Sequence, residues 1–444
     1  MDYKEITFYR NVKERLDKHG TGLCLAKWTQ ATLHLATGRV HMCHHPVSQK
    51  VPLTEIEQTP KALFNNLHLK EQRRQMLTGV RPTECNYCWR IEDANGNDEV
   101  WSDRIFKSGA PWSSSRIDDI KQAGYINDIN PSYLEISFSN ACNFKCSYCS
   151  PNISSQWMEE IERYGSYPTS NNFNNIQWFR QNDQLPIPNN QDNPYVDAFW
   201  KYWPELYPKL HTFRITGGEP LMNKNTFKVL DYIIDNPRKE LELAVNSNLC
   251  VTPQLFDQFI EKAQKVSESV KSLTIYTSAE AKGKRAEYVR YGMDYNLWLD
   301  NCHILLEKVP NTKLTIMSTF NALSVTSFKD FLNDMLSLDM ILDIPYLRYP
   351  HFLSAGILDD SFLEIMKQST DFMKKHDHFT DSSIHGLERI TQMFSSELGQ
   401  DYSQQRQDFI IFIKEYDRRR GTNFLSVFPE MEKFYRDCER LVLP

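Results

Sequence analysis

The stretch YLEISFSNACNFKCSYCSP, residues 133–151, begins as an apolar strand and ends in three closely spaced cysteines. Three residues separate Cys142 from Cys146, and two separate Cys146 from Cys149. Thiolates are the usual protein ligands of an iron-sulfur cube, so this loop can hold three irons of a four-iron cluster. The fourth iron then lacks a protein ligand, and an open coordination position lets a metal centre bind a small molecule, as in catalytic zinc sites. The loop therefore predicts a catalytic cluster.

Around this loop, short apolar runs alternate with helical patterns. Six runs predict strands: YLEISFSN, TFRITGGEP, ELELAVNSN, SLTIYTSAE, KLTIMSTFN and ILDIPYLRYPHF. Helical spacing falls between them at 225–234, 253–266, 297–307 and 327–338. This alternation predicts a parallel sheet with right-handed crossovers. Because six units fall short of eight, the predicted fold is α/β, a partial (β/α)6 TIM-like barrel with a small N-terminal α+β cysteine-rich module and C-terminal helices.

Three regions follow from this pattern. We expect an N-terminal cysteine module at 1–125, the partial barrel at 126–355 and a helical region at 356–444 that packs on the barrel. The barrel carries a long connection at about 164–210, rich in Asn, Gln, Pro and aromatic residues. Long loops at the carboxyl ends of strands are often lids or substrate-binding elements, and a surface insertion without function is the alternative.

Composition narrows the class of protein. Hydrophobic residues make up 41% and charged residues 24% of 444 positions, as in soluble globular proteins. The net charge of -6 gives no broad positive field for nucleic acid or an anionic membrane. No stretch reaches the roughly 18 apolar residues of a membrane span. We therefore expect a cytoplasmic protein without a membrane partner, whose ten cysteines are metal ligands or buried thiols rather than disulfides. The bulk charge argues only weakly against nucleic acid, because a local basic groove is compatible with it.

A second motif, TGGEP at 216–220, follows the second predicted strand directly. Gly217 and Gly218 let the backbone approach a ligand closely, and Glu219 offers acceptor oxygens to an ammonium group. Taken alone, the motif is also compatible with a plain strand-to-helix turn. Like the cysteine loop, it lies at the carboxyl end of a strand, where ligands gather in parallel α/β folds.

With both motifs in this order, the sequence resembles the radical S-adenosylmethionine (radical SAM) superfamily. The resemblance implies that Cys142, Cys146 and Cys149 hold a [4Fe-4S] cluster whose open iron is chelated by the amino and carboxylate groups of S-adenosylmethionine. One-electron reduction, supplied by an external donor such as flavodoxin or ferredoxin, would then release a 5'-deoxyadenosyl radical that abstracts hydrogen from a substrate. The implied cofactor contacts are Tyr148 at the adenine, Gly217, Gly218 and Glu219 at the amino group, and Asn246, Asn248, Ser278 and Arg290 at the ribose or carboxylate. For Arg290, a solvated helix residue is the competing interpretation.

Four more cysteines precede the barrel. Cys24 and Cys43 flank a predicted β-hairpin that contains Gly38, and Cys85 and Cys88 form a CxxC pair after a helical pattern. This half resembles the twitch and SPASM modules of radical SAM enzymes, and the resemblance implies one auxiliary [4Fe-4S] cluster. The module usually follows the barrel, whereas here it precedes it. A zinc site is the alternative, because four cysteines satisfy tetrahedral zinc equally well.

The remaining candidates carry weaker signals. Cys250, Cys302 and Cys438 have no partner spacing and are expected to be buried thiols, although Cys250 could also donate a hydrogen atom to a substrate radical. His44 and His45 are expected to be polar loop residues with ligation as the alternative, and the run EYDRRRGTNF, 415–424, to be a solvated helix end or a site for an acidic partner.

The predicted function is therefore a radical SAM enzyme acting on a peptide or small metabolite with help from an auxiliary cluster. Two alternatives remain: a radical SAM enzyme that modifies RNA or nucleosides, and a non-catalytic iron-sulfur or zinc protein. The GGEP motif counts against the second, since a sensor does not need it.

Overall fold

The computed structural model describes residues 3–94 and 101–442. By compactness the chain forms two units. The first comprises Met1–Ser139, Pro186–Gly217 and Lys239–Leu243, and the second comprises Asn140–Leu185, Gly218–Arg238 and Ala244–Pro444. Strand β7 (Arg238–Asn246) has residues in both units. The predicted division at residues 125 and 355 follows sequence pattern rather than compactness and stays a prediction.

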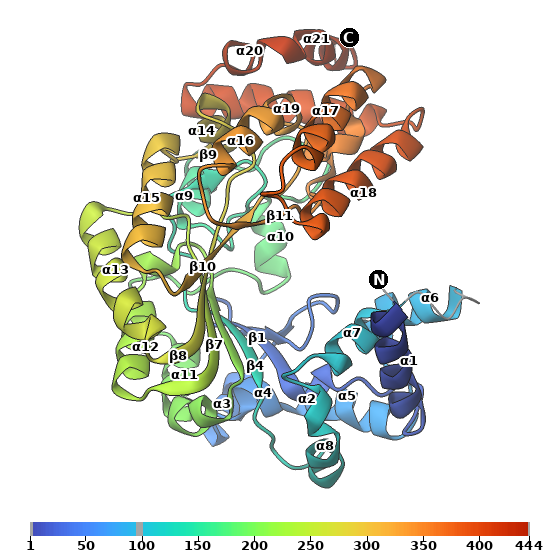
Figure 1. Cartoon of the computed structure of the whole chain (residues 1–444), viewed down its shortest axis with the longest axis vertical. Helices are drawn as coiled ribbons and strands as arrows, with labels where there is room; N and C mark the ends of the chain where they lie inside the picture. Colours follow the sequence, from blue (N-terminus) through green and yellow to red (C-terminus); the bar gives the residue numbers. More distant parts are fainter. Residues whose placement is uncertain (1–2, 95–100, 443–444) are drawn as a thin grey trace. The chain divides into compact units, whose positions relative to one another are not determined.

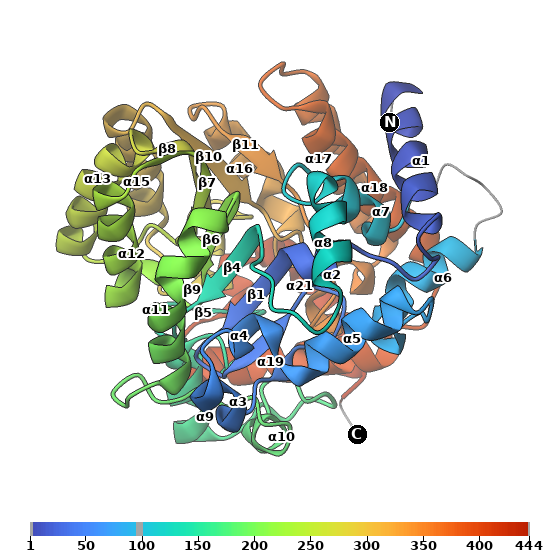
Figure 2. The same cartoon turned by 90° about the horizontal axis from the view of Figure 1, so that it is seen from below.

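In the first unit, strands are ordered β3-β2-β1-β4-β6. β1 (Gln30–His34) runs parallel to β4 (Tyr133–Ser137), which runs parallel to β6 (Thr212–Thr216). β2 (Arg39–His41) pairs antiparallel with β1 and with β3 (Gln49–Lys50), so the predicted hairpin is confirmed. Figure 2 shows β1, β4 and β6 side by side. The hairpin thus extends the parallel sheet beside β4, which the sequence did not indicate.

Figure 1 labels the helices of this unit, three of which, α2, α4 and α5, are linked by a buried arginine. Arg73 is fully buried and donates to the carbonyls of Lys27 and Phe64 and to Asn65 Oδ1 at 2.9, 3.1 and 2.8 Å. These acceptors satisfy the charged group, which would otherwise be costly to bury. The helices are α1 (Tyr3–Asp17), α2 (Ala26–Thr29), α3 (Leu53–Gln58), α4 (Ala62–Asn65), α5 (Leu67–Leu77), α6 (Asn86–Ala94), α7 (Asp103–Gly109), α8 (Ile117–Ala123) and α11 (Pro194–Leu206).

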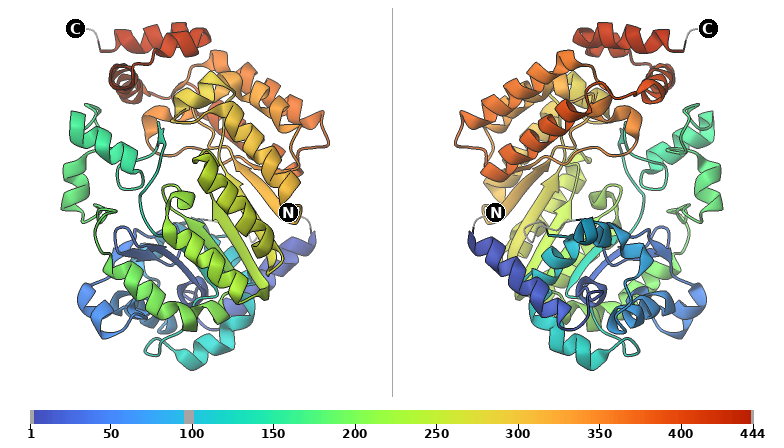
Figure 3. Two further views of the ribbon diagram at one scale, coloured as in Figure 1. Left: turned by 90° about the vertical axis from the view of Figure 1, so that its left-hand side faces the viewer. Right: turned by 90° about the vertical axis from the view of Figure 1, so that its right-hand side faces the viewer.

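The second unit contains the later parallel strands, β8 (Val270–Thr277), β10 (Thr312–Met317) and β11 (Ile341–Asp343). α13 (Pro253–Ser267) starts with a proline, which suits the first helical turn. Its buried residues fall at three- and four-residue spacing, so one apolar face packs on β8. In Figure 3 the light-green helices α12 and α13 lie together, as do the orange α17 and α18.

The further elements of this unit are α9 (Ser155–Tyr164), α10 (Ile176–Gln181), α12 (Lys224–Asp235), α14 (Lys284–Val289), α15 (Tyr295–Lys308), α16 (Phe328–Met335), α17 (Leu363–Lys374), α18 (Asp381–Glu397), α19 (Ser403–Arg420), α20 (Phe424–Val427) and α21 (Glu432–Arg440), with the short strands β5 (Lys145–Cys146) and β9 (Arg290–Tyr291). Of these, α12, α15 and α16 fall where helical spacing predicts them, and α17 to α21 lie in the predicted C-terminal helical region. A mixed α/β fold with parallel strands is confirmed. Closure into a partial barrel and the N-terminal module stay predictions.

The long connection at 164–210 is more ordered than a plain loop, since it contains α10 and α11. Within the second unit, Ser170 donates from its backbone N and its hydroxyl to the buried carboxylate of Asp408, at 2.7 and 2.5 Å. This part of the connection is therefore anchored on α19. Its role as a lid or specificity element stays a prediction.

Two observations concern the whole described chain. Among residues 3–94 and 101–442, none of the helices has both the length and the apolar character that a membrane crossing requires. All ten cysteines are free thiols.

Candidate active site

The cysteine loop lies in the second unit and is held by the start of α9. Ser155 N donates to Asn140 O at 2.7 Å, and the Ser155 hydroxyl accepts from Cys142 N at 3.2 Å. Two residues later, Trp157 Nε1 donates to Cys146 O at 2.8 Å. Helix α9 thus fixes the beginning and the middle of the loop.

A two-residue strand pairing holds the same loop from the other side. Cys146 on β5 lies opposite Arg290 on β9, in antiparallel register. Next to this pair, Gly292 adopts φ +108°, and a Cβ there would come within 2.7 Å of Asn143 O. Glycine is therefore required for the close approach of the two segments.

The three thiols form a mutually interacting group in which Cys142 is buried and Cys146 and Cys149 are half-buried. Burial raises the pKa of Cys142, and the neighbouring Cys146 raises it further. Burial also raises the pKa of Cys149 to about 12, with Cys146 again contributing. Metal ligation requires thiolates, and a bound metal supplies the positive charge that makes them favourable. Three interacting thiols on one loop are therefore a donor set that suits a metal cluster.

Arg290 forms a buried polar triad with residues of two other segments. Its Nε and Nη2 donate to Glu280 Oε2 at 2.9 and 2.6 Å, and its Nη1 lies 3.8 Å from Cys146 Sγ. The half-buried Tyr148 donates its hydroxyl to Glu280 Oε1 at 3.0 Å. Arg290 is only 7% exposed, so its interpretation as a solvated helix residue is wrong. Glu280 was missed, although its place two residues after Ser278 at the end of β8 was a usable signal.

The GGEP turn lies against the start of the cysteine loop. Glu219 N donates to Ala141 O at 2.7 Å. A Cβ on Gly218 would come within 2.8 Å of Asn140 O and would also collide with Ala141 O. In the first unit, Gly217 has φ +134° and lies close to the Ser137 hydroxyl. The second glycine thus permits the approach of two motifs that are about 75 residues apart in sequence.

The carboxylate of Glu219 is buried and already holds three donors. It accepts hydrogen bonds from Leu221 N at 2.9 Å, Ser247 Oγ at 2.8 Å and Asn248 N at 2.6 Å. Burial raises the pKa of Glu219 to about 7. In the structure the carboxylate therefore braces the turn after β6 against the end of β7. Its predicted contact with an ammonium group stays a prediction.

Two asparagines link the end of β7 to the cysteine loop. Asn248 Nδ2 donates to Asn143 Oδ1 at 2.8 Å, and Asn143 Nδ2 donates to Cys250 O at 2.8 Å. Asn143, directly after the first loop cysteine, was missed because its polar side chain resembles any loop residue. Asn246 and Ser278 are half-buried at the ends of β7 and β8.

The three cysteines outside the two cysteine groups differ in burial. Cys302 and Cys438 are fully buried, as predicted. Cys250 is only half-buried, and its Sγ lies 3.6 Å from Asp294 O. Its possible role as a hydrogen-atom donor stays a prediction.

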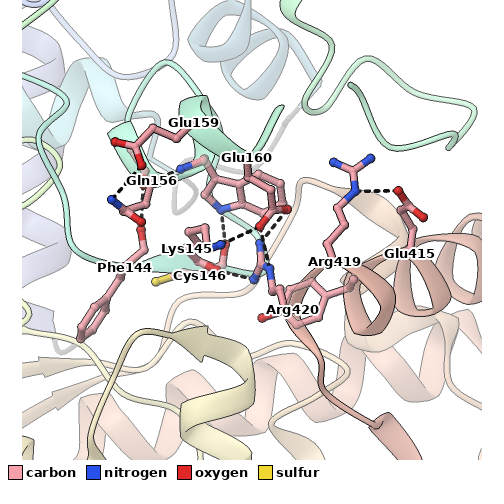
Figure 4. A network of polar contacts seen from close by, with 12 residues as sticks. Phe144, Lys145, Cys146, Gln156, Glu159, Glu160, Glu415, Arg419 and Arg420 are labelled. Carbon is pink, nitrogen blue, oxygen red and sulfur yellow. Dashed lines mark hydrogen bonds and ion pairs between the residues drawn. The ribbon is translucent and has the colours of Figure 1, made fainter. Parts of the chain in front are cut away.

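The end of α19 reaches the cysteine loop through a buried charge network (Figure 4). Arg420 donates to Lys145 O at 2.8 Å and pairs with Glu160 Oε2 at 3.1 Å, and Lys145 Nζ lies 2.8 Å from the same carboxylate oxygen. The guanidinium also lies over the ring of Tyr416, 3.7 Å from its centroid. Burial raises the pKa of Cys146, and the positive charges of Arg290 and Arg420 oppose this rise.

This network corrects the interpretation of 415–424 as a solvated helix end. Arg418 is 59% exposed, but Arg419 and Arg420 have side chains exposed by 1% and 0%. Arg419 donates to Gly165 O at 2.8 Å. Partners from the α9 segment draw these two arginines inward, which helical spacing alone does not reveal.

In the first unit, the four N-terminal cysteines line a single cavity. Cys24 lies before α2, Cys43 follows β2, and Cys85 and Cys88 lie at the start of α6. Burial raises the pKa of Cys85 and of Cys88 to about 12, and Cys24 raises both further. Lys107 Nζ lies 3.0 Å from Cys43 Sγ. Four cysteines are the ligand number of both a four-iron cluster and a tetrahedral zinc ion, and these four line one cavity.

Residues beside this cavity add polar groups. Ligand atoms of Cys43, His44 and Asp103 lie within 4.8 Å of one another, and His45 Nε2 is 2.8 Å from Asp103. His44 Nε2 also lies 3.3 Å from Asp103, so both histidines contact one carboxylate and are not free loop residues. In the hairpin, Gly38 has φ +66° and its Cα packs against the ring of Tyr195, so a side chain would collide there.

Comparisons with known proteins agree with the motifs of the second unit. Residues 136–334 match the model of the Radical SAM superfamily. No curated protein sequence matches the chain.

Solved structures of SuiB match the chain with TM-scores below 0.5. SuiB of Streptococcus suis bound to S-adenosylmethionine has 10% identity and a TM-score of 0.37, over 81% of this chain and 72% of SuiB. SuiB bound to its precursor peptide SuiA has 12% identity and a TM-score of 0.38, over 80% of this chain and 72% of SuiB. Likenesses of this size carry no argument about function.

Proposed function

We propose that the chain is a radical SAM enzyme. Cys142, Cys146 and Cys149 would hold a [4Fe-4S] cluster whose open iron binds S-adenosylmethionine, and the substrate would be a peptide or a small metabolite. The superfamily match over residues 136–334 supports radical SAM catalysis. The observation that carries the proposal is the contact of the cysteine loop with the GGEP turn, through the 2.7 Å hydrogen bond from Glu219 N to Ala141 O.

The chain's own residues prepare the proposed site. When bound, the cluster would pass one electron to S-adenosylmethionine and break a carbon-sulfur bond, giving methionine and a 5'-deoxyadenosyl radical that takes a hydrogen atom from substrate. Arg290 and Arg420 bring positive charge beside Cys146 and so offset the negative charge of a thiolate ligand. The bond between Asn143 and Asn248 keeps the loop beside the end of β7.

For the four cysteines of the first unit we propose an auxiliary [4Fe-4S] cluster of a twitch-like module, with zinc as the alternative. Their common cavity and the ammonium of Lys107 beside Cys43 support a site for anionic thiolates. Four thiolates saturate a cluster, so its role would be electron relay or structural support rather than substrate binding.

The proposed cellular location and electron donor follow from the same chemistry. We propose a cytoplasmic enzyme reduced by flavodoxin or ferredoxin, in keeping with ten free thiols. The anchored connection at 164–210 remains the proposed specificity element, because it is rich in polar and aromatic side chains that can contact a peptide.

Anaerobic reconstitution tests the proposal. Protein with a full iron content is reduced with dithionite in the presence of S-adenosylmethionine, and 5'-deoxyadenosine is measured by chromatography. We expect product from the parent protein and from the control Cys438→Ala, which alters a buried thiol on α21. We expect none from Cys142→Ala.

No 5'-deoxyadenosine from fully loaded parent protein would refute the enzyme proposal and favour a non-catalytic metal protein. Equal product from Cys142→Ala and from the parent would remove the loop from the chemistry.

A further inference from the structure

A cavity in the second unit lies apart from the residues assigned above. It is formed by the segment after β11, by α18 and by the start of α19, and its volume is about 990 Å³. A volume of this size has room for a metabolite or a short peptide segment.

The cavity lies at the carboxyl end of a parallel strand. Ile344 and Pro345 line it and follow β11 directly. β11 runs parallel to β10, and β10 runs parallel to β8. β8 leads to Glu280, which binds Tyr148 of the cysteine loop. Because parallel strands end at one edge of a sheet, the cavity and the cysteine loop share the edge where α/β proteins bind ligands.

Part of the polar lining is satisfied within the protein. Glu397 accepts a hydrogen bond from Tyr402 Oη at 2.9 Å, and the hydroxyls of Tyr346 and Ser354 bond to each other. Glu397 contributes the single carboxylate side chain among the described residues that line the cavity. These groups shape the wall and do not themselves select a charged ligand.

Arg348 and Arg389 differ from other arginines of the second unit in their polar contacts. Both are exposed and line the cavity, and within the part of the chain that the structure describes neither has a hydrogen bond or ion pair. By contrast, Arg406 donates to Ile357 O at 2.7 Å, and Arg418 pairs with Glu415 at 2.7 Å. The cavity is lined by these two guanidinium groups and by one carboxylate, that of Glu397, which already accepts a hydrogen bond. Its lining therefore carries an excess of positive charge.

We propose that this cavity binds the substrate through an oxyanion, a carboxylate or a phosphate, held by Arg348 and Arg389. Guanidinium groups match both anions because their planar N–H groups donate two parallel hydrogen bonds. This inference rests on the proposed function, since it assigns a charged substrate class to the radical site at the same sheet edge.

Isothermal titration distinguishes the two anions without any radical chemistry. Inorganic pyrophosphate and the dipeptide acetyl-Glu-Glu-amide serve as probes for the parent protein, the double variant Arg348→Gln, Arg389→Gln and the control Arg440→Gln. Arg440 is 74% exposed on α21 and outside the cavity. We expect at least one probe to bind, the double variant to bind it at least about tenfold more weakly, and the control to bind as the parent does.

Preferential binding of pyrophosphate indicates a phosphate-bearing substrate, and preferential binding of the dipeptide indicates an acidic peptide. Absence of binding by both probes, or equal binding by parent and double variant, overturns the inference. Both substituted residues are exposed, and equal thermal midpoints verify that the variants fold. Failure of the parent to form 5'-deoxyadenosine would instead refute the proposed function, so the two failures are distinguishable.

Discussion

Arg290 and Glu280 are an oppositely charged pair in which one member lies closer to the proposed cluster. The guanidinium reaches within 3.8 Å of Cys146 Sγ, whereas Glu280 faces Arg290 and Tyr148. A reduced cluster carries one more negative charge than an oxidised one, so a nearby cation stabilises the reduced state. The pair therefore tunes the reduction potential of any cluster held by Cys146.

Substituting each member separately should shift this potential in opposite directions. We expect Arg290→Gln to lower the midpoint potential, and Glu280→Gln to raise it because the cation is left uncompensated, each on the order of 50 mV. Redox titration monitored by electron paramagnetic resonance measures both. Tyr148→Phe removes a hydroxyl without a charge and should move the potential far less. Shifts of the same sign in the two charge variants would contradict this account.

His34 provides a pH-dependent contribution to stability in the first unit. Burial lowers the pKa of His34 to about 4, and the neighbouring His41, 3.0 Å away between Nε2 atoms, lowers it further. In the unfolded chain the pKa is about 6.5, so the unfolded state binds more protons between pH 6.5 and pH 4. Stability from the neutral form is thus present above pH 6.5 and is lost as the pH falls through this window.

We expect acidification from pH 7 to pH 5 to cost about 1–2 kcal/mol through this residue. His34→Gln should flatten the dependence by that amount in urea unfolding curves compared at equal metal content. The exposed His19 offers a matched control, and His19→Gln should leave the parent slope unchanged. A His34→Gln protein with the full parent slope would show that His34 does not titrate in this way.

At the scale of elements, α19 connects the C-terminal helices to the cysteine loop. Arg420 ends this helix and, with its buried partner Glu160, fixes the backbone at Lys145, beside Cys146. Removing one partner of a buried ion pair typically costs 3–5 kcal/mol, because the other charge stays buried without compensation. The loop should then lose its orientation.

Arg420→Met should therefore lower stability by about 3–5 kcal/mol and weaken iron retention by the three-cysteine loop. Thermal unfolding and iron analysis after desalting measure the two effects. Arg418→Met, at an exposed position two residues away, is the control and should change stability by less than about 0.5 kcal/mol. Full iron retention in Arg420→Met would leave α19 with a purely structural role.

Local patterns predicted the parallel strands and the main helices between them, and long-range pairings were missed. The strand TFRIT at β6 and the helix at α13 follow periods of about two and 3.6 residues, which side-chain order within one segment determines. The pairing of β1 with β4 and of β5 with β9 joins segments more than 100 residues apart. No local period encodes such a pairing, so the place of the hairpin beside β4 could not be read from sequence.

The distinction between local patterns and long-range contacts also applies to the candidate site. Cysteine spacing and glycines at strand ends identify residues whose chemistry depends on type and order. The directions of Arg290 and Arg420 depend on buried carboxylates from other segments, Glu280 and Glu160. Such partners decide whether an arginine is solvated or buried, and they become visible only in the folded chain.

At the scale of the whole molecule, each unit carries its own set of cysteines. The three-cysteine loop belongs to the second unit, and the four thiols around one cavity belong to the first. No cysteine is a proposed ligand at both sites. Loss of one metal site should therefore leave the metal content of the other intact, which makes the two sites separable by substitution.

We expect the parent protein to bind about eight irons after anaerobic reconstitution, and Cys85→Ala, Cys88→Ala to bind about four, because a cluster held by the two remaining thiols is lost. Cys142→Ala, Cys146→Ala should also reduce the count to about four, but with loss of 5'-deoxyadenosine formation. Iron, zinc and sulfide analysis together with Mössbauer spectra measure the clusters. A parent protein with about four irons and one zinc, whose zinc disappears in Cys85→Ala, Cys88→Ala, would assign the first-unit site to zinc. Because four thiolates around zinc undergo no redox change, electron relay through the first unit would then be excluded, and its cysteines would serve to stabilise the fold.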